Sequence, residues 1–233
     1  MITALFVGFL ASSSLVIGGV VGTLWDPPGR LVAVALAFAS GALITALSFD
    51  LIEDSFRSGG VVFSGVGMLA GAAVFVIIDS LLDKYIEGAA ESVSGFAILA
   101  AVTIDGVPEN MALGVSLLSG TGVLTLLIAI FASNLPEALS GAVGMKEQGR
   151  SRFFVIATWS ATVLILAASV VLGSAALSGA SNEMLSLLLA FAGGAVLASL
   201  ADTLMPDAYR EGGGLVAFAT VAGFFLSFMV EKV

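Results

Sequence analysis

Two short clusters that combine a proline with a carboxylate lie 28 residues apart in otherwise apolar stretches. The first reads Ile104-Asp105-Gly106-Val107-Pro108-Glu109-Asn110, and the second reads Ser133-Asn134-Leu135-Pro136-Glu137. In each, a polar residue precedes the glutamate by four positions, which places both side chains on one face of a helix. A proline inside a helix removes a backbone donor and crowds the carbonyl four residues earlier, so that a carbonyl oxygen is released. Carboxylate and carbonyl oxygens are the donors that hard metal cations prefer.

These residues predict a site for a divalent metal ion, provided that the two segments face each other. Its predicted ligands are Asp105, Glu109, Ser133, Asn134 and Glu137. An ionised carboxylate at the centre of a bilayer costs at least ~2.5–3.5 kcal/mol, so packing alone does not explain three of them. The alternative interpretation is that each acid is protonated and hydrogen-bonded, and braces a bend in its helix.

The composition places both clusters inside a membrane. Of the 233 residues, 59% are hydrophobic and 11% are charged, which is too little charge to cover a soluble domain of this length. The chain has no cysteine and no histidine, so thiolate and imidazole ligands are excluded. No nucleophile–base pair is visible, and eight scattered basic residues give no support for a nucleic-acid partner. We therefore expect a protein of the lipid bilayer that is not an enzyme and uses no organic cofactor.

Eight segments contain the roughly 20 mostly apolar residues that a membrane-spanning helix needs. They are residues 2–24, 31–54, 60–83, 94–118, 122–146, 152–177, 183–208 and 213–231. The predicted fold is an all-α polytopic membrane protein with eight transmembrane helices in one domain, residues 1–233.

A sequence repeat relates the second segment to the seventh. Ala37-Phe38-Ala39-Ser40-Gly41-Ala42 recurs 153 residues later as Ala190-Phe191-Ala192-Gly193-Gly194-Ala195, and the register continues to Asp54 and Asp207. In the third and eighth segments, Leu69-Ala70-Gly71 and Val221-Ala222-Gly223 align with a slip of one residue. Five passes separate the second segment from the seventh, so the two copies cross the membrane in opposite directions.

The repeat predicts a 3+2+3 arrangement with inverted repeats. Helices 1–3 (residues 1–84) and helices 6–8 (residues 152–233) flank a central pair, helices 4–5 (residues 94–146). Inverted repeats are typical of transporters, whose substrate site lies near the bilayer midplane. The expected mechanism is alternating access, with the flanking repeats rocking against each other.

The basic residues predict the orientation of the chain. With the N-terminus outside, six of the eight Lys and Arg side chains fall on the cytoplasmic side, as the positive-inside rule requires. We therefore expect a multi-pass protein of the cell membrane with both termini extracytoplasmic. Four further acids are candidates for a transport path, because acids at each mouth concentrate cations: Asp50, Asp54, Asp202 and Asp207. The alternative is that these four are ordinary helix-end acids in headgroup water.

The two proline–glutamate clusters resemble the ZIP (Zrt/Irt-like) family of divalent-metal transporters. That family carries His-Asn-x-Pro-Glu-Gly in its fourth span and a similar motif in its fifth, where this chain has Asp105–Asn110 and Ser133–Ala138. The segments Asp50–Asp54 and Asp202–Asp207 are similar to the ends of the family's second and seventh spans. The resemblance implies eight spans, both ends outside, a metal ion as the transported substrate, and a homodimer.

The departures from the family pattern bear on the metal. The family's histidines are replaced by Asp105 and Ser133, and the sixth span lacks the acid that would complete a second metal site. A site without imidazole or thiolate loses its preference for zinc, and oxygen donors suit harder ions. The expected substrate is therefore Mn, Fe(II), Mg or Zn. The alternative function is that of a degenerate ZIP-like metal-binding or sensor protein that does not transport.

Overall fold

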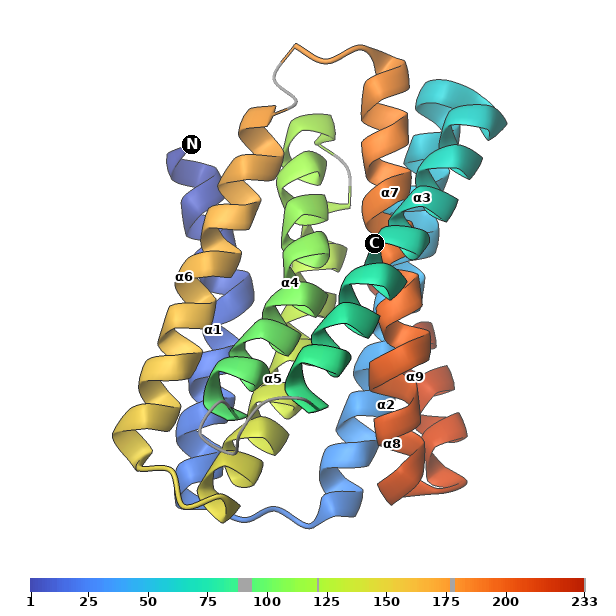
Figure 1. The fold of residues 1–233 in the computed structure, drawn as a ribbon. Coiled ribbons are helices and arrows are strands. Elements are labelled where there is room, and N and C mark those ends of the chain that lie inside the picture. The colour runs from blue at the N-terminus through green and yellow to red at the C-terminus, as the bar shows by residue number, and fades with distance from the viewer. Residues whose placement is uncertain (88–93, 121, 177–178, 233) are drawn as a thin grey trace.

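The computed structural model describes residues 1–87, 94–120, 122–176 and 179–232, and every element in them is helical (Figure 1). The elements are α1 (Ile2–Leu24), α2 (Gly29–Ala46), η1 (Leu47–Ile52), α3 (Glu53–Glu87), α4 (Ser94–Ser119), α5 (Val123–Glu147), α6 (Arg152–Ala176), α7 (Asn182–Ser199), η3 (Leu200–Leu204), α8 (Met205–Gly212) and α9 (Leu215–Glu231). The predicted all-α class is confirmed.

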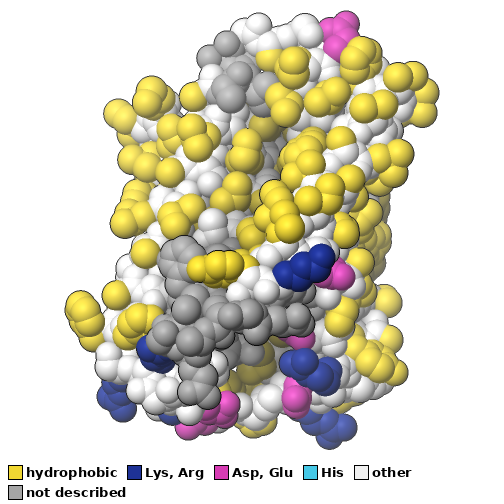
Figure 2. All heavy atoms as spheres, viewed as in Figure 1, with side chains coloured by type: hydrophobic (Ala, Val, Ile, Leu, Met, Phe, Trp, Pro, Cys, Tyr) yellow, Lys and Arg dark blue, Asp and Glu magenta, His cyan; other side chains and the backbone are white. Residues whose placement is uncertain are grey.

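Several helices are long and apolar enough to cross a bilayer. Within the described residues there are five such segments: Ile2–Leu24, Gly29–Leu82, Val123–Glu147, Arg152–Ala175 and Asn182–Gly212. Figure 2 shows apolar side chains over most of the upper part of one face, with most of the visible charges toward its lower end. A belt of exposed apolar side chains belongs in hydrocarbon, so this is a membrane protein.

Two glycines reverse or redirect the chain at opposite ends of the bundle. Gly60 has φ 73°, and there α3 turns back on itself. Gly213 has φ 58° and separates α8 from α9. Both conformations favour glycine because a Cβ is disfavoured at positive φ. The break expected between the second and third segments, residues 31–54 and 60–83, is therefore present, although the helix on its N-terminal side continues from α2 through η1 without another interruption.

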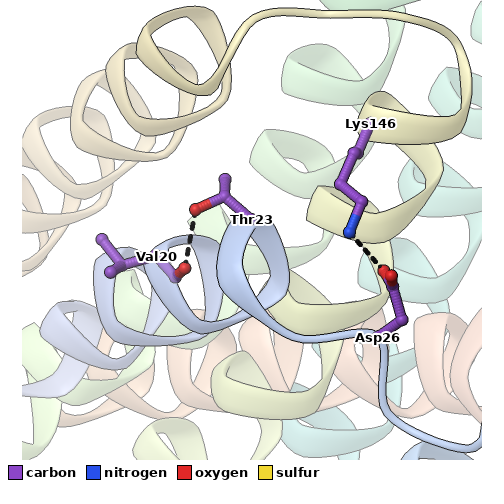
Figure 3. Close-up of polar contacts among 4 residues, drawn as sticks. All are labelled: Val20, Thr23, Asp26 and Lys146. Atoms are coloured by element: carbon purple, nitrogen blue, oxygen red, sulfur yellow. Dashed lines mark hydrogen bonds and ion pairs between the residues drawn. The ribbon is translucent and has the colours of Figure 1, made fainter.

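Lys146 ties the C-terminal end of α5 to the turn that follows α1 (Figure 3). Its ammonium bonds the carboxylate of Asp26. One turn earlier, the Thr23 hydroxyl donates to the Val20 carbonyl at 2.8 Å within α1. Both charged side chains are substantially exposed, so the ion pair contributes little stability. Its main effect is to position the end of α5 relative to the turn after α1.

The helices that carry the sequence repeat each contain a stretch of π-helix. These stretches, η1 and η3, begin at Leu47 and Leu200, which are 153 residues apart, the spacing of the repeat. A π turn leaves the regular bonding ladder of its helix and is frequent at functional sites. Asp50 lies in η1 and Asp202 in η3.

Glycines bring α2 against α9 at backbone distance. A Cβ on Gly41 would lie 1.9 Å from the Thr220 carbonyl oxygen, and a Cβ on Gly223 would lie 1.9 Å from the Phe38 carbonyl oxygen. Such contacts are available to glycine alone, and small residues allow this close approach in membrane helices.

The same reciprocal contact joins α3 to α7. A Cβ on Gly71 would lie 1.9 Å from the Phe191 carbonyl oxygen, and one on Gly194 would lie 2.0 Å from the Met68 carbonyl oxygen. Gly194 follows Gly41 by 153 residues and Gly223 follows Gly71 by 152, which is the register of the sequence repeat including its slip of one residue.

Packing divides the described helices into two groups. The first comprises α1, α4, α5 and α6, in which α1 packs along α5 and α6, and α4 packs along α6. The second comprises α2, α3, α7, α8 and α9, built on the α2–α9 and α3–α7 pairs. Helices of the two expected flanking repeats are thus in close contact inside the second group, whereas α4 and α5 belong to the first.

Candidate metal site

Asp105 of α4 faces α7. Its side chain is buried, with 8% of the residue exposed, and its Oδ1 accepts a hydrogen bond of 2.8 Å from the Ser199 hydroxyl. Ser199 is the last residue of α7 and directly precedes η3. A hydrogen bond to a charged acceptor is stronger than a neutral one, so this contact fixes the direction of the carboxylate.

Glu109 lies one turn further along α4 and is also buried. The neighbouring Asn110 is fully buried and faces α1, where its Oδ1 accepts a hydrogen bond of 3.3 Å from Ser12. Its Nδ2 donates to the Gly106 carbonyl oxygen at 2.9 Å. Asn110 therefore links α4 to α1 and stabilises the turn that contains Pro108.

The α5 residues present one carboxylate and one amide. Glu137 is partly exposed, whereas Ser133 and Asn134 are buried. The Ser133 hydroxyl donates to the Ile130 carbonyl oxygen at 3.0 Å, so only its lone pairs remain for a ligand. The Asn134 Nδ2 atom is buried without a hydrogen-bond partner. A half-turn flip of the Asn134 side-chain amide exchanges its nitrogen and oxygen, so the oxygen can occupy the position of this unpaired nitrogen.

The three carboxylates lie within electrostatic range of one another. The charge of Glu109 interacts with that of Asp105, and the charge of Glu137 interacts with both. Like charges in a medium of low dielectric constant repel strongly, and a divalent cation between them removes that repulsion.

The three carboxylates do not converge on one position in this structure. Within the part of the chain that the structure describes, no three Asp or Glu side chains form a group that could hold a metal ion. Any ion bound here would therefore need oxygen donors other than carboxylates. The Ile104 and Ala132 carbonyl oxygens are candidates, because Pro108 and Pro136 lie inside the continuous helices α4 and α5 and cannot donate to them.

The four candidate path residues differ in their surroundings. Asp50 is buried and Asp54 is partly exposed, whereas Asp202 and Asp207 are exposed. Asp207 forms an ion pair of 3.3 Å with Arg210, and the charges of both Asp202 and Asp207 reach Asp105.

A polar cavity of about 350 Å³ lies between α2, α5 and α8. Its lining includes Ser140 and Glu147 of α5, together with Asp207 and Glu211 of α8. Ser140 is three residues beyond Glu137, so the cavity begins close to the central carboxylates. An apolar cavity of similar volume, about 350 Å³, lies beside Pro108 and Met111 and offers a cation almost no polar surface.

Two contacts of the site were not predicted from the sequence, namely those from Ser199 and Ser12. Both are single hydroxyl residues in apolar helices, and a serine in such a helix usually bonds its own backbone. The signal for Ser199 was its position three residues before Asp202.

Replacing Ser199 by alanine is expected to destabilise the fold by about 1–3 kcal/mol, because the buried Asp105 carboxylate loses a donor. Thermal unfolding of the purified protein in detergent measures the effect. Ser174→Ala is the matched control, since its hydroxyl donates to the Val171 carbonyl oxygen of its own helix. Equal effects of the two substitutions would contradict a role for Ser199 in holding Asp105.

Comparison with known proteins shows a similarity that extends over most of the chain. No protein-family model matches the chain. A protein of Arabidopsis thaliana named "Putative zinc transporter At3g08650" is 24% identical over 195 residues, which cover 80% of this chain and 31% of the relative. The chain thus spans about a third of the length of that relative. Over most of its own length, this membrane protein is similar to a zinc-transporter-like protein.

Proposed function

We propose that the chain transports divalent metal cations across a membrane, through a carboxylate site between α4 and α5. The observation that carries the proposal is the group of acids Asp105, Glu109 and Glu137 on two proline-bearing helices of a membrane bundle. Holding three like charges near one another inside a membrane is costly unless a cation compensates them. The name of the Arabidopsis relative, "Putative zinc transporter At3g08650", supports the same class of substrate.

The proposed ligands are Asp105, Glu109, Asn134 and Glu137, with Ser133 as a weak neutral donor. All are oxygen ligands in a chain without histidine or cysteine. Such a set suits Mn, Fe(II) or Mg and binds Zn less selectively than an imidazole site.

The proposed topology has eight passes in a 3+2+3 order, with both termini outside the cytoplasm of a cell. Two features support inverted repeats: the π-helical stretches at equivalent positions, and the reciprocal glycine contacts of α2–α9 and α3–α7. The reversal at Gly60 divides the long segment Gly29–Leu82 into two passes.

Packing suggests which parts move in alternating access. The glycine contacts bind α2 to α9 and α3 to α7 at backbone distance, which favours movement of each pair as a rigid unit. The contacts of α4 and α5 with that group are less extensive and include the side-chain bond of Asp105 to Ser199. We therefore propose that the group α1, α4, α5 and α6 moves against the other, which revises the expectation that the flanking repeats rock against each other.

Uptake by the purified protein in liposomes tests the function. With a metal-sensitive dye inside, vesicles that contain the protein are expected to take up Mn²⁺ faster than protein-free vesicles, and the rate should saturate with metal concentration. Zn²⁺ and Mg²⁺ are assayed in parallel to define the ion. The second candidate, a metal-binding or sensor protein, is favoured by the lack of a converged carboxylate group among the described residues. Saturable metal binding without uptake would establish that candidate and overturn transport.

A further inference from the structure

A second group of acids lies away from the central site, where η1 meets the end of α9. Asp50 of η1 is buried, with 3% of the residue exposed. Its carboxylate lies within hydrogen-bonding reach of the carboxylate of Glu231, the last residue of α9. Thr125, in the first turn of α5, donates to the Glu231 Oε2 atom at 3.0 Å. We call Asp50, Thr125 and Glu231 the η1–α9 cluster.

The cluster leaves one buried carboxylate oxygen without a donor. Asp50 Oδ2 is fully shielded from solvent and has no hydrogen-bond partner. The backbone at the start of α5 lies directly against Asp50, because a Cβ on Gly122 would be 2.3 Å from its carboxyl group. Even so, Asp50 Oδ2 accepts no hydrogen bond from the first turn of α5, so helix capping does not satisfy this oxygen. A buried acceptor oxygen without a partner carries a desolvation cost that a ligand would remove.

The net charge around the cluster is negative enough to be neutralised by a divalent cation. Asp50 lies within electrostatic range of two other acids, Glu231 and Asp54, and of one base, Lys232. These four groups carry a net formal charge of two negatives when ionised. The Lys232 ammonium lies 5.1 Å from the ring centroid of Phe49 and 5.5 Å from that of Phe228. A cation is therefore already held beside the cluster by aromatic faces.

Two carboxylates that face each other with no donor between them need either a shared proton or a cation. We propose that the η1–α9 cluster is a second cation site, which binds a hard divalent ion through Asp50, Glu231 and the Thr125 hydroxyl. The donors are all oxygen, and ions such as Mn²⁺, Mg²⁺ and Ca²⁺ accept such sets with water completing the shell. Glu231 is partly exposed, so the ion enters from the end of α9.

The site also joins the two groups of helices. Thr125 belongs to α5, in the first group, whereas Asp50 and Glu231 belong to the second. An ion held by all three would fasten the first turn of α5 to η1 and α9. Binding of the ion at this place does not depend on transport through the central site.

Mn²⁺ binding to the purified full chain in detergent, followed by electron paramagnetic resonance, tests the proposal. The double variant Glu109→Gln/Glu137→Gln disables the central site and is expected to retain about one Mn²⁺ per chain. Adding Asp50→Asn or Glu231→Gln to that background should weaken the remaining binding at least tenfold, and Thr125→Val should weaken it less. Glu183→Gln, an exposed acid at the start of α7, is the control and should change nothing.

Either of two results would overturn the proposal. One is a double variant that binds no Mn²⁺. The other combines binding with infrared spectroscopy. Mn²⁺ binding would be retained in both Asp50→Asn and Glu231→Gln, and a protonated-carboxyl infrared band would persist at saturating Mn²⁺ and disappear in Asp50→Asn. That result would show that the two carboxylates share a proton. Thermal unfolding of each variant establishes that a loss of binding is not a loss of fold. Because this experiment measures binding and the liposome assay measures uptake, failure of the second-site proposal can be distinguished from failure of the transport proposal.

Discussion

Glu137→Gln should reduce divalent-metal uptake into liposomes at least about 100-fold while leaving the thermal stability of the protein equal or higher. Substitution of residues that merely support metal ligands typically costs 10–100-fold in affinity, and loss of a charged ligand should cost no less. Glutamine keeps the shape and hydrogen-bonding capacity of the side chain, but it removes the expense of an ionised acid inside the membrane. The expected pattern is therefore lost transport in a well-folded protein.

This substitution separates the metal site from its structural alternative. If Glu137 were a protonated brace in its helix, glutamine would reproduce it and uptake would be unchanged. Glu183→Gln is the control, because Glu183 is an exposed acid at the start of α7 and lines neither the site nor the polar cavity. An uptake rate equal to that of the unmodified protein in Glu137→Gln would remove Glu137 from the proposed site.

Alanine in place of Gly71 or Gly223 should destabilise the protein by several kcal/mol or prevent its folding. In each case the new methyl group would lie 1.9 Å from a backbone carbonyl oxygen of the neighbouring helix. Overpacking typically costs about 1–3 kcal/mol and more where backbone must move, as it must here. Thermal unfolding in detergent, with yield as a second readout, measures the loss.

Gly65→Ala is the matched control for these substitutions. It lies in the same helix as Gly71, but a Cβ there would meet nothing within 4 Å. Alanine is favoured over glycine in a helix by about 0.8–1 kcal/mol, so this variant should be as stable as the parent or more so. Comparable losses in Gly65→Ala and Gly71→Ala would show that the close helix contacts do not govern stability. Similar losses at Gly71 and Gly223 are expected if the two contacts are equivalent.

The sequence pattern was sufficient to predict the helical class and most helix ends. Apolar length predicted the helices, and the expected boundaries near residues 60 and 213 coincide with turns that the structure contains. The spacing of Asp105 and Glu109 predicted a shared helix face, and both side chains are buried. These features depend on local chemistry, which a single chain displays directly.

Features that depend on contacts between distant helices were not predicted. Asp50 lies in a π-helical stretch, and no residue type specifies such a stretch. The partner of Asp50 lies in α9, at Glu231, and the partner of Asp105 lies in α7, at Ser199. Helical periodicity gives the face on which a residue lies, but it does not give the helix that will occupy that face.

The turns at Gly60 and Gly213 have a practical consequence for spectroscopy. They lie at opposite ends of the bundle, where α3 reverses and where α8 meets α9 (Figure 1). The space around a Cβ at either position is open. The chain has no cysteine of its own, so a thiol introduced beside either turn, for instance at Gly214, would be the sole attachment point for a spin label or fluorophore. Distance measurements with thiol labels normally require the natural cysteines to be removed first. This sequence already provides that thiol-free background.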